Sequence, residues 1–192
     1  MKLNLPADPS QVTLRQFIDY KLAVDEIERL VIATGRSREA VMRLNPEAAN
    51  YVISSFETVI DQTRGELKRH IRLKKGFRRV RLSFIPALES MTLAEHVDLD
   101  DLTRVIWKEG KYEYLVKLFT VLYRPVNKRL GKWYELIPYD SEKNAHEYFI
   151  DRLDMDTVNA ALLFFSTIAN ELSRNSLDYL EREAMTATKS NK

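Results

Sequence analysis

The hydrophobic pattern of this chain is mainly helical. Apolar residues recur at three- and four-residue spacings over much of its length, which is typical of helices that each bury one face. The first stripe predicts a helix that begins near Thr13 and Gln16, a pair at capping-box spacing, and ends at Gly35. Its apolar members are Phe17, Tyr20, Val24, Ile27, Leu30 and Val31.

Two further helices are predicted before the middle of the chain. Ser37 can cap a short helix that runs through Leu44. Asn45 followed by Pro46 favours a second start, because Asn can accept a hydrogen bond from the first turn and Pro needs no donor there. This helix is predicted to reach about Leu67, with its apolar face at Val52, Phe56, Val59 and Ile60.

The stretch 84–125 is the centre of the predicted fold. Thr92 and Glu95 have capping-box spacing and predict a helix start. Acids crowd the following turn, where a second helix could begin, since acids are favoured near helix N-termini. These acids are Asp98, Asp100 and Asp101. Beyond Gly110 another apolar stripe predicts a helix that ends near Tyr123, because Pro125 disfavours helical backbone at the preceding residue.

Residues 69–84 are predicted to form a basic β-hairpin. Apolar and cationic residues alternate on both sides of a turn at Lys75-Gly76, which is typical of two strands with one buried face. The apolar positions are Ile71, Leu73, Val80, Leu82 and Phe84, and the alternating outward positions include Arg72, Lys74, Arg79 and Arg81. A further short strand is predicted over residues 133–137.

The C-terminal helix is predicted over residues 154–185. Its core face would consist of Val158, Ala161, Leu162, Phe165, Ile168, Ala169 and Leu172. The run 160–165 is apolar all round, which indicates burial on several sides. The sequence therefore predicts a mainly α fold: one domain over residues 1–192, built as a helical bundle with a long C-terminal helix and a small β-hairpin.

Composition narrows the class of protein. The chain has 192 residues and no Cys, so disulfides and thiolate metal sites are excluded. It starts without the apolar core of a signal peptide, and no apolar run approaches the roughly 20 residues that span a bilayer. We expect a protein without membrane contact that is made in a cytoplasm and stays there or inside a particle assembled there.

Charge is distributed in alternating blocks although the net charge is only +2. Residues 64–81 carry nine Lys or Arg and one acid, whereas residues 89–113 carry seven acids. Such blocks suit pairing with copies of the same chain or with charged neighbours. The candidate partner-binding residues are Arg72, Lys74, Lys75, Arg78, Arg79 and Arg81. The hairpin could bind an acidic protein surface, bind nucleic acid with Phe77 and Phe84 stacking on bases, or simply be solvated.

Motifs for catalysis and cofactor binding are missing from the sequence. There is no phosphate-binding glycine loop, and the three His residues have no metal-ligand spacing, although His96 lies among acids. No nucleophile motif surrounds a Ser. We expect no enzyme activity, no cofactor and no small-molecule substrate.

Four short motifs in the second half of the chain carry a family resemblance. They are Phe84-Ile85-Pro86-Ala87-Leu88, Thr92-x-x-Glu95-x-Val97-Asp98-Leu99, Leu122-Tyr123-Arg124-Pro125 and Met155-x-x-x-x-Ala160-Ala161-Leu162-x-Phe164-Phe165. In this order, over residues 84–172, the chain resembles a family of virion structure and assembly proteins from tailed bacteriophages, crAss-like phages included. Ala94 stands where that family has a Gly.

This resemblance implies a role in bacteriophage morphogenesis and no catalytic residues. It implies a homo-oligomeric ring or connector subunit of the head–tail region, in contact with portal or tail components and located in the virion. A tail assembly chaperone, present in the host cytoplasm during assembly, is the alternative within the family. A nucleic-acid-binding module that contacts DNA non-specifically through the basic hairpin is the alternative from another class.

Overall fold

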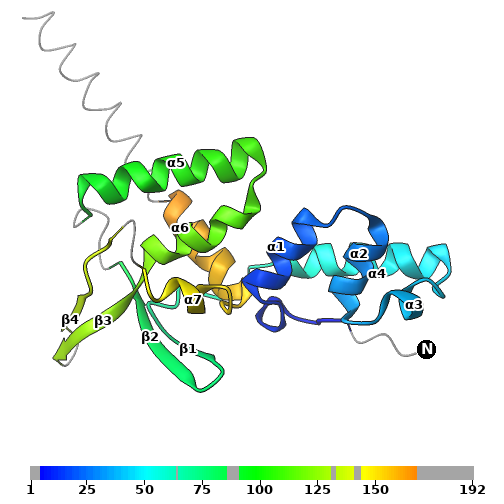
Figure 1. Cartoon of the computed structure of the whole chain (residues 1–192), viewed down its shortest axis with the longest axis horizontal. Helices are drawn as coiled ribbons and strands as arrows, with labels where there is room; N and C mark the ends of the chain where they lie inside the picture. Colours follow the sequence, from blue (N-terminus) through cyan, green and yellow to red (C-terminus); the bar gives the residue numbers. More distant parts are fainter. Residues whose placement is uncertain (1–4, 64, 86–90, 131–132, 141–143, 168–192) are drawn as a thin grey trace, which may run out of the picture.

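A computed structural model of the protein describes residues 5–63, 65–85, 91–130, 133–140 and 144–167. The N-terminal part is a group of helices, and the second part combines helices with a small sheet at its edge (Figure 1). The helices of the first part are α1 (Leu14–Leu22), α2 (Glu26–Thr34), α3 (Arg38–Val41) and α4 (Pro46–Ile60). The second part contains β1 (His70–Lys75), β2 (Arg78–Phe84), α5 (Leu93–Glu109), α6 (Leu115–Leu122), β3 (Tyr123–Leu130), β4 (Trp133–Leu136), α7 (Glu147–Ile150) and a helix over residues 155–167.

The first predicted helix is two helices in the structure. α1 ends before Ala23, and α2 begins after Asp25, whose side chain accepts a hydrogen bond from the N–H of Glu28. Glu28 in turn accepts from the N–H of Val24 at 2.9 Å. This reciprocal capping is the physical reason for the break, because it satisfies donors that a continuous helix would have bonded internally. Gly35 ends α2 with a φ of +64°, as predicted.

Other helix boundaries also differ from the prediction, and α3 ends at Val41 rather than at Leu44. α4 starts after Asn45 as predicted but ends at Ile60 rather than near Leu67. α5 runs without interruption past the acids at 98, 100 and 101, so no second helix begins there. The capping box at its start is confirmed, since Thr92 and Glu95 each accept from the other's backbone N–H. The acids simply lie along one continuous helix.

The strands form a four-stranded antiparallel sheet in the order β1-β2-β3-β4. The predicted hairpin is therefore part of a larger sheet. β2 pairs with β3 only from Leu82 to Phe84, and β3 then pairs with β4 from Val126 onward. The two ribbons diverge beyond this short junction (Figure 1). β3 begins directly at Tyr123, where α6 ends.

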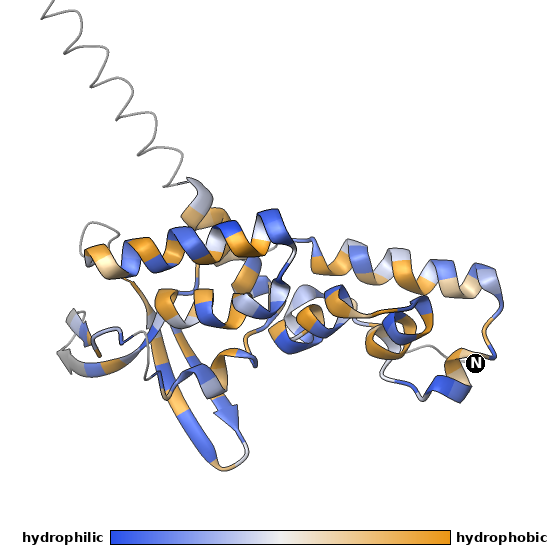
Figure 2. Ribbon diagram, turned by 45° about the horizontal axis from the view of Figure 1, so that its top comes forward, coloured by the Kyte–Doolittle hydropathy of each residue, from blue (hydrophilic) through white to orange (hydrophobic). Residues whose placement is uncertain are grey.

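The two parts share one hydrophobic core. Its largest fully buried side chains include Tyr20 and Phe56 from the first part and Phe84, Phe119 and Tyr123 from the second. Backbone bonds also join them: the N–H of Leu14 donates to the carbonyl of Leu153 at 2.7 Å. Apolar and polar segments alternate along the helices (Figure 2), as expected for helices that bury one face.

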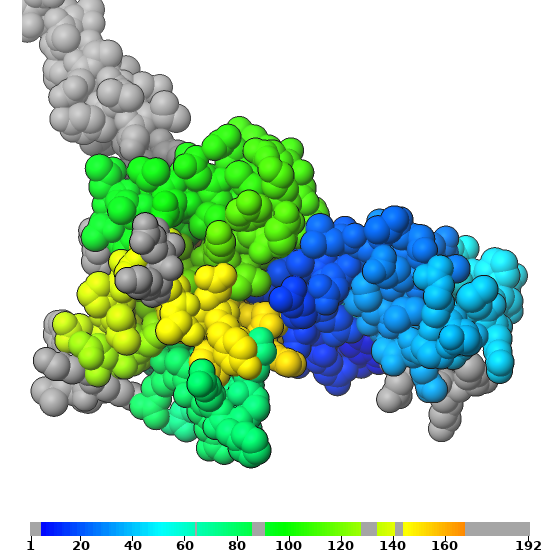
Figure 3. Space-filling view, in the orientation of Figure 1, coloured from blue at the N-terminus to red at the C-terminus, as the bar shows by residue number. Residues whose placement is uncertain are grey.

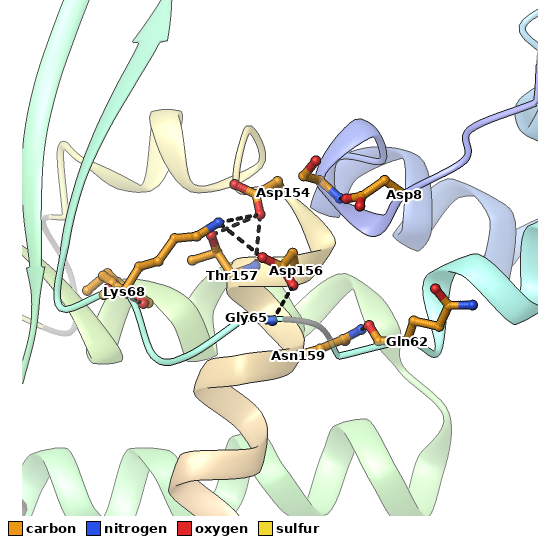
Figure 4. Close-up of polar contacts among 10 residues, drawn as sticks. Asp8, Gln62, Gly65, Lys68, Asp154, Asp156, Thr157 and Asn159 are labelled. Atoms are coloured by element: carbon orange, nitrogen blue, oxygen red, sulfur yellow. Dashed lines mark hydrogen bonds and ion pairs between the residues drawn. The ribbon is translucent and has the colours of Figure 1, made fainter.

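The start of the helix 155–167 holds the linker between α4 and β1. Asp156 accepts from the N–H of Gly65 at 3.0 Å, and the ammonium of Lys68 lies 3.3 Å from both Asp154 and Asp156 (Figure 4). Asn159 donates to the carbonyls of Ile60 and Gln62. Burial opposes the charged form of Lys68, but the two carboxylates outweigh it and raise its pKa. These contacts fix where the hairpin leaves the body.

The fold is thus an α-rich α+β arrangement. The predicted helix over 154–185 is observed from residue 155 to residue 167, and its remainder lies outside the described residues. The long C-terminal helix and the helical bundle stay predictions.

Candidate anion-binding face of the hairpin

The turn of the hairpin is made by Gly76 and Phe77. Lys75 and Arg78 are partners in the register, so a two-residue loop joins the strands. Gly76 has a φ of +60°, a conformation in which a side chain would be strained. The sequence placed the turn one residue earlier, at Lys75-Gly76, but the outward positions of the two strands are the same as predicted.

Four cations lie together on one face of β1 and β2. Arg72 is opposite Arg81, and Lys74 is opposite Arg79. All four side chains are exposed, as predicted for the outward positions. Directly opposed residues have Cβ atoms about 5 Å apart, and alternate residues along a strand are about 7 Å apart. We call Arg72, Lys74, Arg79 and Arg81 the cationic face.

The cationic face has no acidic counterpart within the described part of the chain. The ion pairs recorded there involve other cations, such as Lys75, Arg104 and Arg124. Like charges directly opposed across two strands are destabilising. The face therefore carries an electrostatic cost that an anionic partner would remove.

A hollow of about 690 Å³ lies over this face. The cationic face and the intervening Leu73 and Val80 form its floor, and Val126 and Asn127 of β3 form its side. The hollow forms because β3 pairs with β2 no further than Leu82–Pro125, and the two strands separate beyond that pair. The hairpin projects from the body of the molecule (Figure 3).

Lys75 and Arg78 do not belong to the cationic face. The register places both on the opposite side of the hairpin. The ammonium of Lys75 donates to Asp151 at 2.8 Å and to the carbonyl of Tyr148 at 3.0 Å, and lies 4.0 Å from the centre of the Tyr148 ring. Lys75 thus ties the hairpin to α7. Of the six predicted partner-binding residues, the structure brings four together and separates these two.

The two aromatic residues proposed to stack on bases lie in different environments. Phe77 is fully exposed at the tip of the hairpin. Phe84 is buried and makes edge contacts with Tyr123 and Phe164, at 5.2 and 5.7 Å between ring centres. Phe84 therefore belongs to the core and cannot stack on a base. The alternation had placed Phe84 on the core-facing side of the hairpin, and its burial confirms that side.

The acidic block on α5 is partly engaged within the chain. Asp98 accepts from the hydroxyl of Tyr139 at 2.8 Å, and Asp101 pairs with Arg104 at 2.8 Å. Burial and the Asp98 carboxylate together raise the pKa of Tyr139 above its ordinary value. Both acids line a hollow of about 240 Å³ with Lys117 and Glu147. This surface carries charges of both signs. It therefore complements the cationic face less well than the alternating charge blocks of the sequence suggested.

Val126 and Asn127 are the site residues that the sequence reasoning missed. Their strand was not predicted, because Pro125 and Lys128 interrupt the alternation on which a strand prediction depends. The Tyr123 that precedes them was assigned only as a helix end. A strand that follows a helix without a loop leaves no turn signal to mark it.

Comparisons with protein-family models, with curated proteins and with solved structures found no match for this chain. In the described residues no cluster of three or more His, Cys, Asp or Glu side chains has the arrangement of a metal site. None of the helices in those ranges is both long and apolar enough to span a bilayer.

Proposed function

We propose that this protein is a non-catalytic assembly subunit that binds an anionic surface of another protein through the cationic face of its hairpin. The observation that carries the proposal is the array of Arg72, Lys74, Arg79 and Arg81, which forms no ion pair within the described part of the chain, beside a hollow. Electrostatic complementarity of this kind steers association and fixes the partner's orientation.

The setting of the proposal is a tailed-phage particle, and it rests on the resemblance over residues 84–172. Within that setting the protein acts as a homo-oligomeric ring or connector subunit of the head–tail region, next to portal or tail proteins. A tail assembly chaperone uses the same surface but leaves before maturation. Mass spectrometry of purified virions separates the two roles, since only the connector remains in the particle.

The binding face is tested with a pair of adjacent substitutions. Arg79→Glu reverses a charge on the cationic face, and Arg78→Glu makes the same charge change on the opposite side of the hairpin. Binding to polyglutamate, a probe for acidic protein surfaces, should weaken at least about tenfold for Arg79→Glu and far less for Arg78→Glu. Equal losses would mean that only net charge matters and would refute an oriented binding face.

Binding of single-stranded nucleic acid is the second candidate, and the exposed Phe77 favours it. A cationic groove next to an exposed aromatic ring is the usual arrangement for sequence-independent binding. Phe77→Ala should then weaken binding to a short oligonucleotide and leave polyglutamate binding unchanged. If the oligonucleotide binds more tightly than polyglutamate at equal salt, and Phe77→Ala abolishes the difference, the nucleic-acid function replaces the protein-binding one.

A further inference from the structure

An apolar groove lies between α5, α6 and the helix 155–167, away from the hairpin. Its volume is about 460 Å³. Trp107 and Leu163 form its rim, with exposed fractions of 51% and 58%. The remaining lining residues are Thr103, Leu118, Leu162, Phe165 and Ser166. Two large apolar side chains that remain half exposed on adjacent helices indicate a surface that another element covers.

The sequence of the helix strengthens this interpretation. The apolar run 160–165 predicts burial on several sides. In the structure Ala160 and Ala161 are buried, and Phe164 packs against Phe84. Leu163 is exposed and Phe165 is only half-buried. The described residues thus cover one side of this run and leave the groove side open.

The chain contains a segment with the composition to fill the groove. Residues 168–185 follow the groove-lining helix directly, and Leu177, Leu180 and Ala184 recur at i, i+3 and i+7. This segment has no Gly or Pro, and neither does the rest of the chain to residue 192. Gly and Pro are the strongest signals for a sharp reversal of a helical sequence. The segment is therefore poorly suited to turn back onto its own groove.

We propose that the apolar groove binds residues 168–185 of a second copy of the chain. The exchange is reciprocal, so each copy donates a segment and accepts one, and the contact closes as a symmetric dimer. As a helix, the segment would be about 27 Å long, enough to lie along the groove and beyond it. Reciprocal burial of two such helices is compatible with a stable interface of roughly 1,200–2,000 Å².

Engineered cysteines test which chain supplies the segment, because the natural chain has none. Thr103→Cys places a thiol in the groove, and Ser176→Cys places one beside Leu177. Mixing the two full-length variants under mild oxidation should give a disulfide-linked dimer on a non-reducing gel. Phe77→Cys at the hairpin tip, mixed with Ser176→Cys, is the control and should not give that dimer above background. A double variant Thr103→Cys/Ser176→Cys that closes within one chain at every concentration would overturn the proposal.

A charge substitution tests the groove itself. Leu163→Glu should raise the dissociation constant of the dimer at least about tenfold by light scattering, because the new carboxylate would be buried against apolar side chains. Leu93→Glu changes another exposed apolar residue, 80% accessible at the start of α5, and should leave the dimer intact. A monomeric natural chain at high concentration, or equal dissociation constants for both variants, would overturn the proposal. Neither readout depends on anion binding by the hairpin.

Discussion

Glu95→Gln should lower the stability of the fold far more than a change of one atom would suggest. The Glu95 carboxylate is 3% exposed and accepts from Arg124, which is 10% exposed, at 2.5 Å. Its second oxygen accepts from the N–H of Thr92 at 2.7 Å and completes the capping box of α5. Gln keeps the size and the acceptor for Thr92 but removes the charge. Arg124 would then be a buried cation without a counter-ion.

The cost follows from this geometry. Removing one partner of a buried ion pair costs about 3–5 kcal/mol, because the remaining charge stays desolvated. For a chain of this length 1 kcal/mol corresponds to roughly 2–4 °C, so the melting temperature should fall by roughly 6–20 °C. Glu95→Ala also removes the cap and should cost about 1 kcal/mol more. Urea unfolding followed by circular dichroism, at one fixed protein concentration, measures these differences.

Two controls decide whether burial is the cause. Asp101→Asn breaks the exposed pair with Arg104 on the same helix, and its effect should be small. In a double-mutant cycle, Glu95→Gln with Arg124→Met should cost much less than the sum of the single changes, since no buried charge remains. Additive costs, or a loss below about 1 kcal/mol for Glu95→Gln, would refute the reasoning.

This pair also illustrates what the sequence could predict. The spacing of Thr92 and Glu95 is local, so the capping box was predictable from four consecutive residues. The contact of Glu95 with Arg124 joins positions 29 residues apart and depends on how α5 packs over the start of β3. Periodicity along the chain contains no information on that packing.

The hairpin shows the same limit at the candidate site. Strict alternation and Gly76 were enough to predict two strands and one cationic face. The contacts of Lys75 with Tyr148 of α7 and with Asp151, which follows α7, could not be predicted, because this short helix has no sequence signal of its own. The break between α1 and α2 was predictable in principle, since Asp25 and Glu28 have the spacing of a cap. The longer apolar stripe obscured it.

Three further predictions concern stability. Gly65→Ala should lower it by about 1–3 kcal/mol in thermal unfolding, because the new Cβ would lie 2.7 Å from the Asp156 carboxylate. Lys75→Met should cost about 1.5–3 kcal/mol in urea yet weaken polyglutamate binding less than Arg79→Glu does. The third prediction is a pH dependence. His146 is buried, with Nε2 3.0 Å from the carbonyl oxygen of Thr120, and burial lowers its pKa from 6.5. The unfolded chain therefore binds a proton more readily than the folded one, so stability should fall as the pH drops below 6.5, until the folded pKa is reached. His146→Gln should remove this part of the pH dependence, and His96→Gln, at an exposed position, should retain it. Parallel curves for all three proteins between pH 5 and 7.5 would contradict the assignment.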